Sequence, residues 1–212
     1  MPKILTPKDV LQFRQRLCDL ALKAFAEQGV EGMSLRGLAA AAGCSRTTPY
    51  RYFKDKADIL AAVRQAQFQR LADENEAVAL QENDPDKRLV ALARCYVRFA
   101  MANPDAYRVM FSVNQQDEQR YPALVKQIKR ANQSMKNAVN ESLEKGSLAG
   151  DPANIVHILW AGLHGIVSLH LSDKLHMGRG IDELAEVMIR SLSQAVAAQP
   201  SKQAAARRVR EG

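Results

Sequence analysis

The sequence contains little of what disulfide-stapled, metal-binding or membrane-spanning proteins require. Its only cysteines are Cys18, Cys44 and Cys95, and their wide spacing fits neither a disulfide framework nor a zinc site. We interpret them as small buried hydrophobic residues, with a redox sensor as a remote alternative. No charge-free apolar run reaches membrane length, and the N-terminus does not resemble a signal peptide. These absences predict a cytoplasmic protein that does not associate with a membrane.

Groupings typical of catalysis or metal binding are also missing. The sequence shows no Ser/His/Asp arrangement, no glycine loop that would cradle a phosphate, and no paired carboxylates on one helix face. The histidines are spaced by seven, six and six residues, whereas a chelating pair on a helix needs a spacing of three or four. We therefore expect no catalytic site, no metal and no cofactor. The four histidines are His157, His164, His170 and His176.

The positive charge of the chain is unevenly distributed. The formal net charge is +7 over 212 residues, of which 47% are hydrophobic. Residues 1–60 carry ten Lys and Arg against six Asp and Glu, residues 61–199 carry sixteen of each, and residues 200–212 carry four against one. Because the excess lies at the two ends of the chain, nucleic acid is the partner that best explains it.

The stretch from Ser34 to Lys56 predicts two short helices joined by a turn. Ser34 can cap the first helix, whose apolar residues fall at helical spacing and would face inward. Gly43 can adopt the left-handed conformation that ends this helix. Ser45 can cap a second helix that reaches Tyr52. A helix, a glycine turn and an exposed second helix form a helix-turn-helix.

The second helix has the composition expected of a helix in a DNA major groove. It is polar, basic and aromatic, with arginines that suit guanine edges and phosphates. Pro49 complicates this helix, because proline lacks an N–H and crowds the carbonyl of Ser45. Either the helix starts late, with Thr48 as its cap and Pro49 at its first position, or its first turn is distorted.

This stretch resembles the DNA-binding domain of the TetR family of bacterial transcriptional regulators. Cys44 departs from the resemblance, since the family usually has a larger aliphatic residue there. Lys56 would open the next helix, where its charge and free backbone N–H groups suit a phosphate. The matching residues are Leu38-Ala39, Ala42-Gly43, Tyr50, Tyr52-Phe53, Lys56 and Ile59-Leu60. The expected DNA contacts are Ser34, Arg36, Ser45, Arg46, Thr47, Thr48, Tyr50, Arg51, Tyr52 and Lys56.

The rest of the chain predicts helices only, so the expected fold class is all-α, with about nine helices in total. We expect a helix-turn-helix DNA-binding domain at residues 1–58, a helical ligand-binding and dimerisation domain at 59–198, and a basic, disordered tail at 199–212. Caps, prolines and glycines place the longer helices at about 6–28, 55–81, 85–102, 104–113, 121–145, 151–176 and 181–198. The helix at 55–81 is long enough to link the two domains.

Residues 151–176 are apolar almost all round the expected helix, so every side of that helix must be covered. A second copy of the chain would cover one side, and Gly162 and Gly165 would let a partner helix approach closely. The TetR resemblance implies the same arrangement, a four-helix dimer interface made by the last two long helices. The run WAGLHG also resembles a histidine-glycine segment of one C-terminal subgroup of that family. We therefore expect a homodimer formed through residues 151–176 and 181–198.

Aromatic residues gather between Tyr96 and Phe111. They are interpreted either as ordinary core or as the lining of an apolar ligand pocket, and composition does not separate the two. The family resemblance favours the pocket, because TetR members commonly bind small molecules there. His164 is interpreted as a hydrogen-bonded core or interface residue in preference to a polar handle in a cavity. The expected pocket residues are Phe68, Tyr96, Phe99, Tyr107, Phe111, Trp160 and His164.

Together these features predict a transcriptional regulator whose partner is double-stranded DNA. The hypothesis is a dimeric repressor that places two recognition helices in successive major grooves of a palindromic operator. A small-molecule effector of unknown identity would release it by favouring another dimer geometry. One rival is a ligand-independent helix-turn-helix protein with a structural C-terminal domain. The other is an all-helical enzyme, for which the sequence shows no catalytic grouping.

Overall fold

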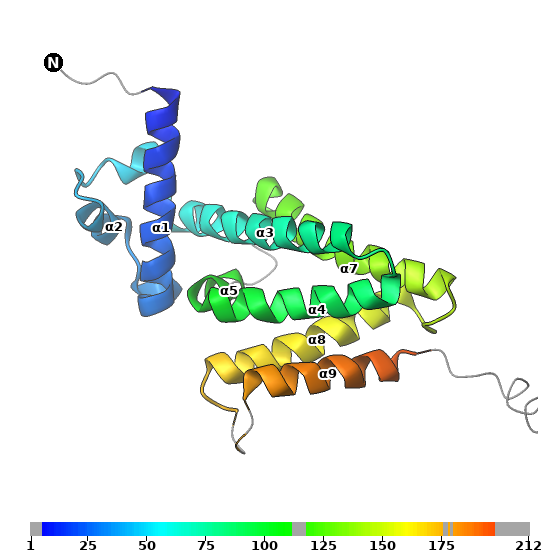
Figure 1. Cartoon of the computed structure of the whole chain (residues 1–212). Helices are drawn as coiled ribbons and strands as arrows, with labels where there is room; N and C mark the ends of the chain where they lie inside the picture. The colour runs from blue at the N-terminus through cyan, green and yellow to red at the C-terminus, as the bar shows by residue number, and fades with distance from the viewer. Residues whose placement is uncertain (1–5, 112–117, 176–177, 179, 198–212) are drawn as a thin grey trace, which may run out of the picture. The chain divides into compact units, whose positions relative to one another are not determined.

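The fold is built from helices. The computed structural model describes residues 6–111, 118–175, 178 and 180–197, so the predicted tail at 199–212 lies outside the described residues. The described residues form eight α-helices and one 3-10 helix, with a single β-bridge between Leu148 and Ala197, which confirms the all-α prediction. The elements are α1 (Pro7–Gly32), α2 (Leu35–Ala41), η1 (Pro49–Arg51), α3 (Lys56–Gln81), α4 (Pro85–Ala102), α5 (Pro104–Met110), α7 (Pro122–Glu144), α8 (Pro152–Leu171) and α9 (Ile181–Ala195) (Figure 1).

Three helices begin at the capping residues that the sequence indicates. Thr6 Oγ1 accepts a hydrogen bond from the Asp9 N–H at 3.2 Å, and the Asp9 carboxylate accepts one from the Thr6 N–H at 2.8 Å. Ser34 Oγ accepts from the Gly37 N–H at 3.1 Å and caps α2. The Asp55 carboxylate accepts an N–H from the first turn of α3 at 2.8 Å. Because each cap satisfies a group that the helix leaves free, the local sequence sets these helix starts.

Residues with positive φ set the breaks between helices. Gly43 has φ +65°, the left-handed conformation predicted for the turn after α2. Gly29 has φ +70° inside α1, so the predicted end at residue 28 is a kink, after which helical structure continues to Gly32. At the other end of the chain, α8 stops at Leu171, before its predicted end at residue 176, and Asp173 follows with φ +52°.

Internal contacts divide the chain into two compact units, which we describe one at a time. Unit one consists of Met1–Asp73 and Ala102–Ala131, and unit two consists of Glu74–Met101 and Asn132–Gly212. This division follows packing within the chain. The predicted boundary at residue 58 separates a DNA-binding from a ligand-binding domain, which is a functional division, and it stays a prediction.

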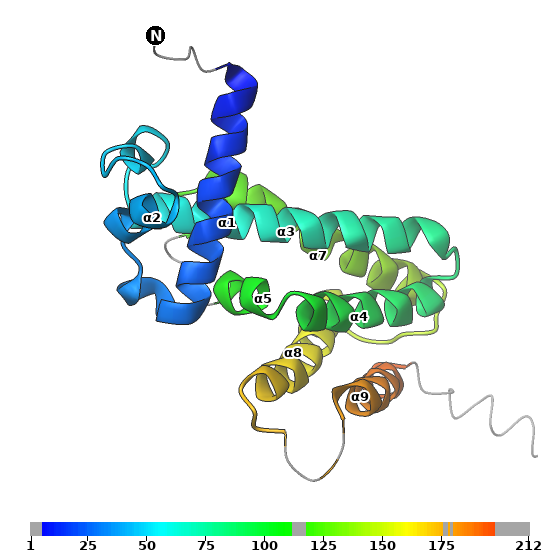
Figure 2. The ribbon, with the colours of Figure 1, turned by 60° about the vertical axis from the view of Figure 1, so that its left-hand side comes forward.

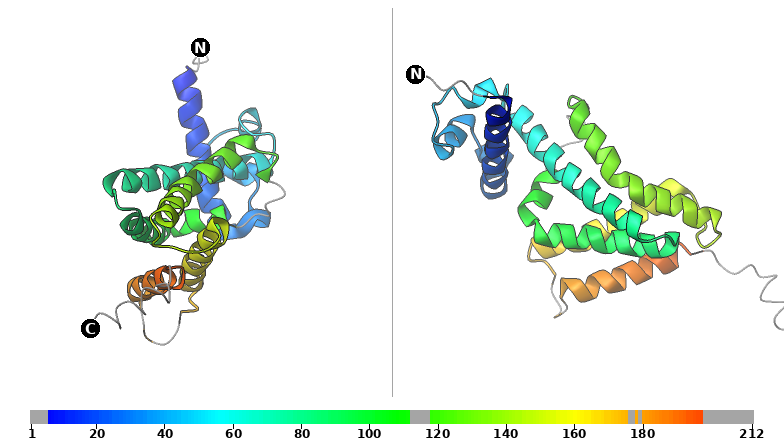
Figure 3. Two further views of the ribbon diagram at one scale, coloured as in Figure 1. Left: turned by 90° about the vertical axis from the view of Figure 1, so that its right-hand side faces the viewer. Right: turned by 45° about the horizontal axis from the view of Figure 1, so that its top comes forward.

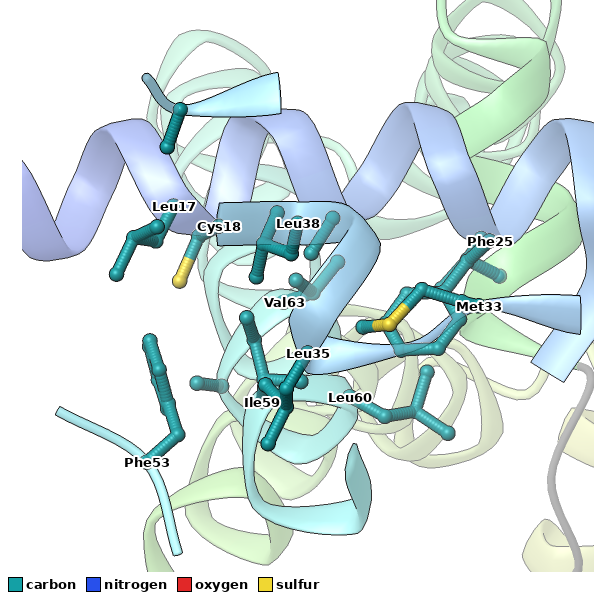
Figure 4. Close-up of a cluster of buried hydrophobic side chains, with 14 residues drawn as sticks. Leu17, Cys18, Phe25, Met33, Leu35, Leu38, Phe53, Ile59, Leu60 and Val63 are labelled. Carbon is teal, nitrogen blue, oxygen red and sulfur yellow. The ribbon is translucent and has the colours of Figure 1, made fainter. Parts of the chain in front are cut away.

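The core of unit one joins α1, α2 and the start of α3 around Phe53, which is 1% exposed. Buried side chains from these elements point toward one another (Figure 4). Helix α1 also packs against α2 and α5, as Figure 2 shows. Each large apolar side chain buried in this way contributes about 1.5–3 kcal/mol. The labelled members of the cluster are Leu17, Cys18, Phe25, Met33, Leu35, Leu38, Phe53, Ile59, Leu60 and Val63.

Two of the three cysteines are buried, as interpreted from the sequence. Burial raises the pKa of the Cys18 thiol to about 11, and it also raises the pKa of Cys95. Both thiols therefore stay protonated and unreactive at neutral pH. Cys44 is only partly buried.

A charged residue, Arg64, lies in the interior of unit one, and the sequence gives no sign of its burial. Its side chain is 4% exposed, and its Nε and Nη2 atoms donate to the Met110 carbonyl at 2.9 and 2.5 Å. Nη2 also pairs with Glu118, whose side chain is 12% exposed. The guanidinium lies 5.8 Å from the centre of the Phe68 ring. Arg64 therefore satisfies a carbonyl at the end of α5 and balances the charge of Glu118.

Unit two contains the helix pair α8 and α9, which lie side by side (Figure 1 and Figure 3). A Cβ built at Gly162 would lie 2.7 Å from Leu192 Cδ1, so glycine allows α9 to approach α8 at this point. The close approach predicted for Gly162 therefore occurs within one chain, where we had expected a partner helix. At Gly165 a Cβ would meet no atom within 4 Å. A separate buried cluster joins α4, α7 and α8.

We predict that Arg64→Met lowers the free energy of unfolding by about 3–5 kcal/mol. The substitution leaves the Glu118 carboxylate and the Met110 carbonyl in the interior without the guanidinium that satisfies them. Adding Glu118→Leu should recover part of the loss, because no charge then remains buried. Chemical denaturation followed by circular dichroism measures these differences.

Arg108→Met is the matched control, because Arg108 and its partner Asp105 are each about half exposed. Its cost should stay below about 1 kcal/mol. Equal losses for Arg64→Met and Arg108→Met would mean that burial adds nothing to the Arg64 pair.

Candidate nucleic-acid interface

The second helix of the predicted helix-turn-helix is shorter and tighter than expected. It is a 3-10 helix, Pro49–Arg51, with Thr48 at its N-cap position. The helix therefore starts late, at Pro49, as one alternative predicted, although the Thr48 side chain makes no capping hydrogen bond. An α-helix capped by Ser45 is wrong. Proline has no N–H to donate to the Ser45 carbonyl, so the backbone bonds here span three residues. They run from the Thr48 N–H to Ser45 and from the Tyr52 N–H to Pro49, each at 3.0 Å.

We call residues 45–52 the recognition segment, and most of its predicted DNA contacts are exposed. The Tyr50 side chain is 58% exposed, and Arg46, Thr47 and Arg51 are exposed beside it. These four side chains form what we call the outer side of the segment. The other exposed members of the predicted set are Ser34, Arg36 and Ser45.

Two members of the predicted set face the protein in part. The Tyr52 ring lies 5.3 Å from the Phe13 ring of α1, and Tyr52 is half-buried. Thr48 is also half-buried, with its Oγ1 2.8 Å from Ser45 Oγ. Pro49, between them, is fully buried. These residues hold the segment against unit one, which leaves the outer side to face a ligand.

Lys56 is the first residue of α3, as predicted, and its ammonium group already has a partner. Nζ lies 3.3 Å from Oε2 of Glu31, whose side chain is 97% exposed. An exposed pair contributes at most about 1 kcal/mol, so a phosphate can displace the carboxylate. The first turn of α3 is less open to an anion than expected. The Asp55 carboxylate accepts the Asp58 N–H, and the Asp58 carboxylate accepts the Lys54 N–H just before the helix. The Lys56 side chain is thus a better phosphate ligand than the helix end.

An open hollow of about 450 Å³ lies in unit one between α1 and the recognition segment. Arg16 and Arg51 line it from the two sides, so it presents two guanidinium groups. Arg16 is not among the predicted contacts, because an arginine on a polar helix face has no sequence signal that separates it from a solvated charge. Arg14, two residues earlier, lies 4.8 Å over the Phe53 ring. The lining residues are Asp9, Gln12, Phe13, Arg16, Cys44, Thr48, Arg51 and Tyr52.

The aromatic residues predicted to line a pocket fall into two groups. In unit one, the Phe111 ring lies 6.0 Å from Phe68 and 4.9 Å from Tyr107. In unit two, Trp160 stacks on His164, and Phe99 is 1% exposed. The predicted common pocket of the seven residues stays a prediction.

His164 occupies a half-buried site on α8. Its Nδ1 lies 3.2 Å from the Tyr96 hydroxyl, and its Nε2 lies 3.3 Å from Ser168 Oγ. Its ring stacks on Trp160 with ring centres 5.1 Å apart. Burial lowers the pKa of His164 below its usual value of 6.5. These contacts agree with the interpretation that His164 is a hydrogen-bonded interior residue.

Unit two also contains a cavity of about 250 Å³ between α4, α8 and α9. The sequence does not predict this cavity, because its walls come from apolar stripes that look the same whether they enclose a space or pack tightly. None of the seven predicted pocket residues lines it. The lining residues are Asp86, Leu89, Val90, Ala93, Met135, Ser147, Leu148, Leu159, Leu163, Ile189, Leu192, Ser193, Val196 and Ala197.

The described residues offer no metal cluster and one long apolar helix. No group of three or more His, Cys, Asp and Glu side chains there could hold a metal ion. One described helix, α8, is long and apolar enough to cross a membrane by length and composition, and 28% of its apolar window is buried within the chain. Core helices of soluble proteins meet the same criterion, so this finding is weak evidence for a membrane span.

Two family models match the chain. The model of bacterial regulatory proteins of the tetR family matches residues 17–63, which include the helix-turn-helix. A model of the tetracyclin repressor-like C-terminal domain matches residues 89–192, which run from within α4 to within α9. The chain is also similar to the HTH-type transcriptional regulator SAB2452 of Staphylococcus aureus, with 38% identity over 74 residues. That alignment covers 32% of this chain and 40% of the relative, so the chain spans two fifths of its length.

Solved structures share the fold over most of the chain. A protein of unknown function from Rhodococcus sp. RHA1 superimposes with a TM-score of 0.75 and 27% identity, covering 88% of this chain and 96% of that one. A TetR family transcription regulator from Marinobacter aquaeolei VT8 gives a TM-score of 0.76 and 19% identity, covering 92% and 100%. At that identity the second likeness concerns the fold alone.

We predict that the stability contributed by His164 is lost as the pH falls. Its pKa is lower in the folded chain, so the unfolded chain binds the proton more tightly. The contribution is therefore fully present above the usual histidine pKa of 6.5 and is lost as the pH falls through the folded value. Denaturation curves for wild type and His164→Gln between pH 5 and 8 measure it. A difference between the two proteins that grows toward acidic pH would have the wrong sign for a buried neutral imidazole.

Proposed function

The chain belongs to the TetR family of bacterial transcriptional regulators, and from this premise we propose that it is a repressor which a small molecule releases from its operator. TetR family regulators bind DNA and act as dimers, and they are regulators rather than enzymes. The observation that carries the proposal is the outer side of the recognition segment. Its four exposed polar side chains stand on a segment whose inner residues are held in the core.

Each side chain of the outer side suits a part of the DNA. Arg46 and Arg51 offer paired donors to guanine edges or phosphates, and the Thr47 hydroxyl suits either. The exposed Tyr50 ring suits the sugar-phosphate wall of the groove. The Lys56 ammonium group would leave the Glu31 carboxylate and pair with a DNA phosphate. Two copies related by a two-fold axis would place their recognition segments about 34 Å apart, in successive major grooves of a palindromic operator.

The dimer would form through α8 and α9. Helix α8 exposes Ile158 at 46%, Trp160 at 41% and Leu169 at 43%, and α9 exposes Val187 at 39%. Large apolar side chains gathered on one helix pair are typical of a surface that a partner covers. A second copy offers the same surface, which gives a self-complementary four-helix interface.

The proposed dimer also accounts for the apolar character of α8 without a membrane. TetR family regulators are soluble DNA-binding proteins, and a cytoplasmic location would give this chain access to chromosomal DNA. In that setting a second copy of the chain, and not lipid, would cover the exposed face of α8.

We predict that Lys56→Ala and Arg46→Ala weaken DNA binding in different ways. Lys56→Ala should weaken binding to operator and scrambled duplexes alike and reduce the salt slope by about one, because a phosphate contact carries no sequence information. Arg46→Ala should cost about 1–3 kcal/mol on the operator and relax the preference at one position in each half-site. An operator selected from a random duplex pool with the purified protein allows both titrations.

Lys87→Ala provides the control for charge, because Lys87 is an exposed lysine of α4. It should leave both affinity and salt slope unchanged. Unchanged binding by both Lys56→Ala and Arg46→Ala would show that the recognition segment does not contact DNA, and the proposal would lose its main support.

We also predict that Gly165→Arg yields a folded monomer that binds operator at least about tenfold more weakly. A Cβ at this position meets nothing within 4 Å in one chain, so the substitution is compatible with the fold. At an interface between copies it would bury an unpaired charge, at a cost of several kcal/mol. Sedimentation measures the oligomeric state and circular dichroism the fold. Ala77→Arg, at an exposed position of α3, should remain dimeric; a wild-type monomer at micromolar concentration would refute the interface.

A further inference from the structure

None of the residues proposed to contact DNA or a second copy lines the cavity between α4, α8 and α9. It lies wholly within unit two and is separate from the predicted aromatic pocket, since different residues line it. Its walls are mostly aliphatic and include Leu89 and Ala93 of α4, Leu159 of α8, and Leu192 and Val196 of α9. All of these but Leu192 are buried, whereas the lining residues Asp86 and Val90 are half-buried and Ala197 is exposed, so the cavity reaches the surface at one side.

The cavity is large enough for a small organic molecule. An apolar cavity of about 150 Å³ in a protein core accepts benzene, which has six non-hydrogen atoms. By the same ratio, the 250 Å³ found here would hold roughly ten non-hydrogen atoms. An alkyl chain of about eight carbons with a small polar head has that size.

The three polar residues that line the cavity offer hydrogen-bond acceptors. Ser193 Oγ donates its proton to a carbonyl one turn earlier in α9, at 2.8 Å. Ser147 Oγ lies 2.5 Å from Asp86 Oδ1, so its proton is held there or by the backbone carbonyl 3.0 Å away. Asp86 is a carboxylate, 2.8 Å from Lys145 Nζ. Because both hydroxyl protons are already donated, what remains toward the cavity is oxygen lone pairs.

We propose that this cavity binds a small apolar molecule with a hydrogen-bond-donor head, an aliphatic alcohol or amine, and discriminates against aliphatic carboxylates. A hydroxyl or ammonium group can donate to Ser193, Ser147 or Asp86. Lys145 pairs with both Asp84 and Asp86, so these two carboxylates and one ammonium keep one net negative charge, which attracts an ammonium head. A carboxylate head offers no proton to these acceptors and is repelled by Asp86. Discrimination thus comes from an unfavourable contact as well as a favourable one.

The position of the cavity connects it to the helix pair assigned to the dimer. Leu192 lines the cavity, and the same side chain meets Gly162 where α9 approaches α8. A molecule in the cavity therefore contacts the side chain that sets the spacing between the two helices. That the bound molecule acts as the effector rests on the proposed function; that it binds does not.

Calorimetric titration of the full-length protein without DNA tests the binding. The probes are 1-octanol, octylamine and octanoate, which share an alkyl chain of similar length and differ in the head group. Octanol and octylamine should bind with one site per chain, and octanoate at least about tenfold more weakly. Absence of saturable binding by all three, or equal binding of octanoate and octanol, would overturn the proposal.

Paired variants locate the site. Ala93→Leu fills part of the cavity and should weaken octanol binding at least about tenfold, whereas Ala91→Leu, on the same helix outside the lining, should not. Ser193→Ala removes one acceptor and should weaken octanol binding about two- to tenfold, while Ser191→Ala, exposed on α9, should not. Circular dichroism confirms that each variant is folded. Wild-type affinity in both Ala93→Leu and Ser193→Ala would place the bound molecule elsewhere.

The effector role is tested separately, on the selected operator. Octanol or octylamine should weaken operator binding by wild type and not by Ala93→Leu. If the probes bind but the operator affinity does not change, the cavity is a binding site without the effector role. If the protein selects no operator at all, the proposed function fails while the calorimetric result stands.

Discussion

The recognition segment depends on its anchors in the core of unit one. It contains only one turn of 3-10 helix, and so short a helix is unstable by itself because nucleation is costly. Pro49 and Phe53 are each less than 2% exposed, and Phe53 belongs to the buried cluster of α1, α2 and α3. The fixed φ of proline further reduces the entropy lost on ordering the segment. The outer side chains therefore point outward without needing contacts of their own.

In unit two the governing constraint is the apolar surface of α8. Helix α9 covers part of it, and the two helices approach closely because Gly162 has no side chain to obstruct Leu192. The two helices do not pack equally tightly everywhere, since Leu192 also borders the cavity. Ile158 and Leu169, about three turns apart on one side of α8, remain exposed in one chain. One helix thus presents three different environments: a tight contact, an internal space and an open apolar face.

Local signals were sufficient where a residue acts on its own backbone. Ser34 caps the start of α2 and Gly43 forms the turn after its end, as predicted. Pro49 indicated a late start to the recognition helix, although the 3-10 form of that helix was not predicted. Local sequence signals failed where burial and packing depend on residues far away in the chain. Arg64 looks like any solvated arginine until α5, which follows α3 by a whole helix, supplies a carbonyl for it. The cavity escaped notice for the same reason: a stripe of apolar residues does not reveal how well its partner fills the space.

The energetics of sequence recognition require two copies of this surface. A good bidentate contact to a base contributes about 1–3 kcal/mol, whereas specific binding exceeds non-specific binding by about 4–10 kcal/mol. The outer side of one recognition segment has two arginines, Arg46 and Arg51, which reach only the lower part of that range. A second copy doubles the contacts, and a rigid interface makes the second set of contacts effectively intramolecular. In the proposed dimer, the apolar side of α8 and the outer side of the recognition segment would therefore be coupled, because neither would suffice for operator recognition alone.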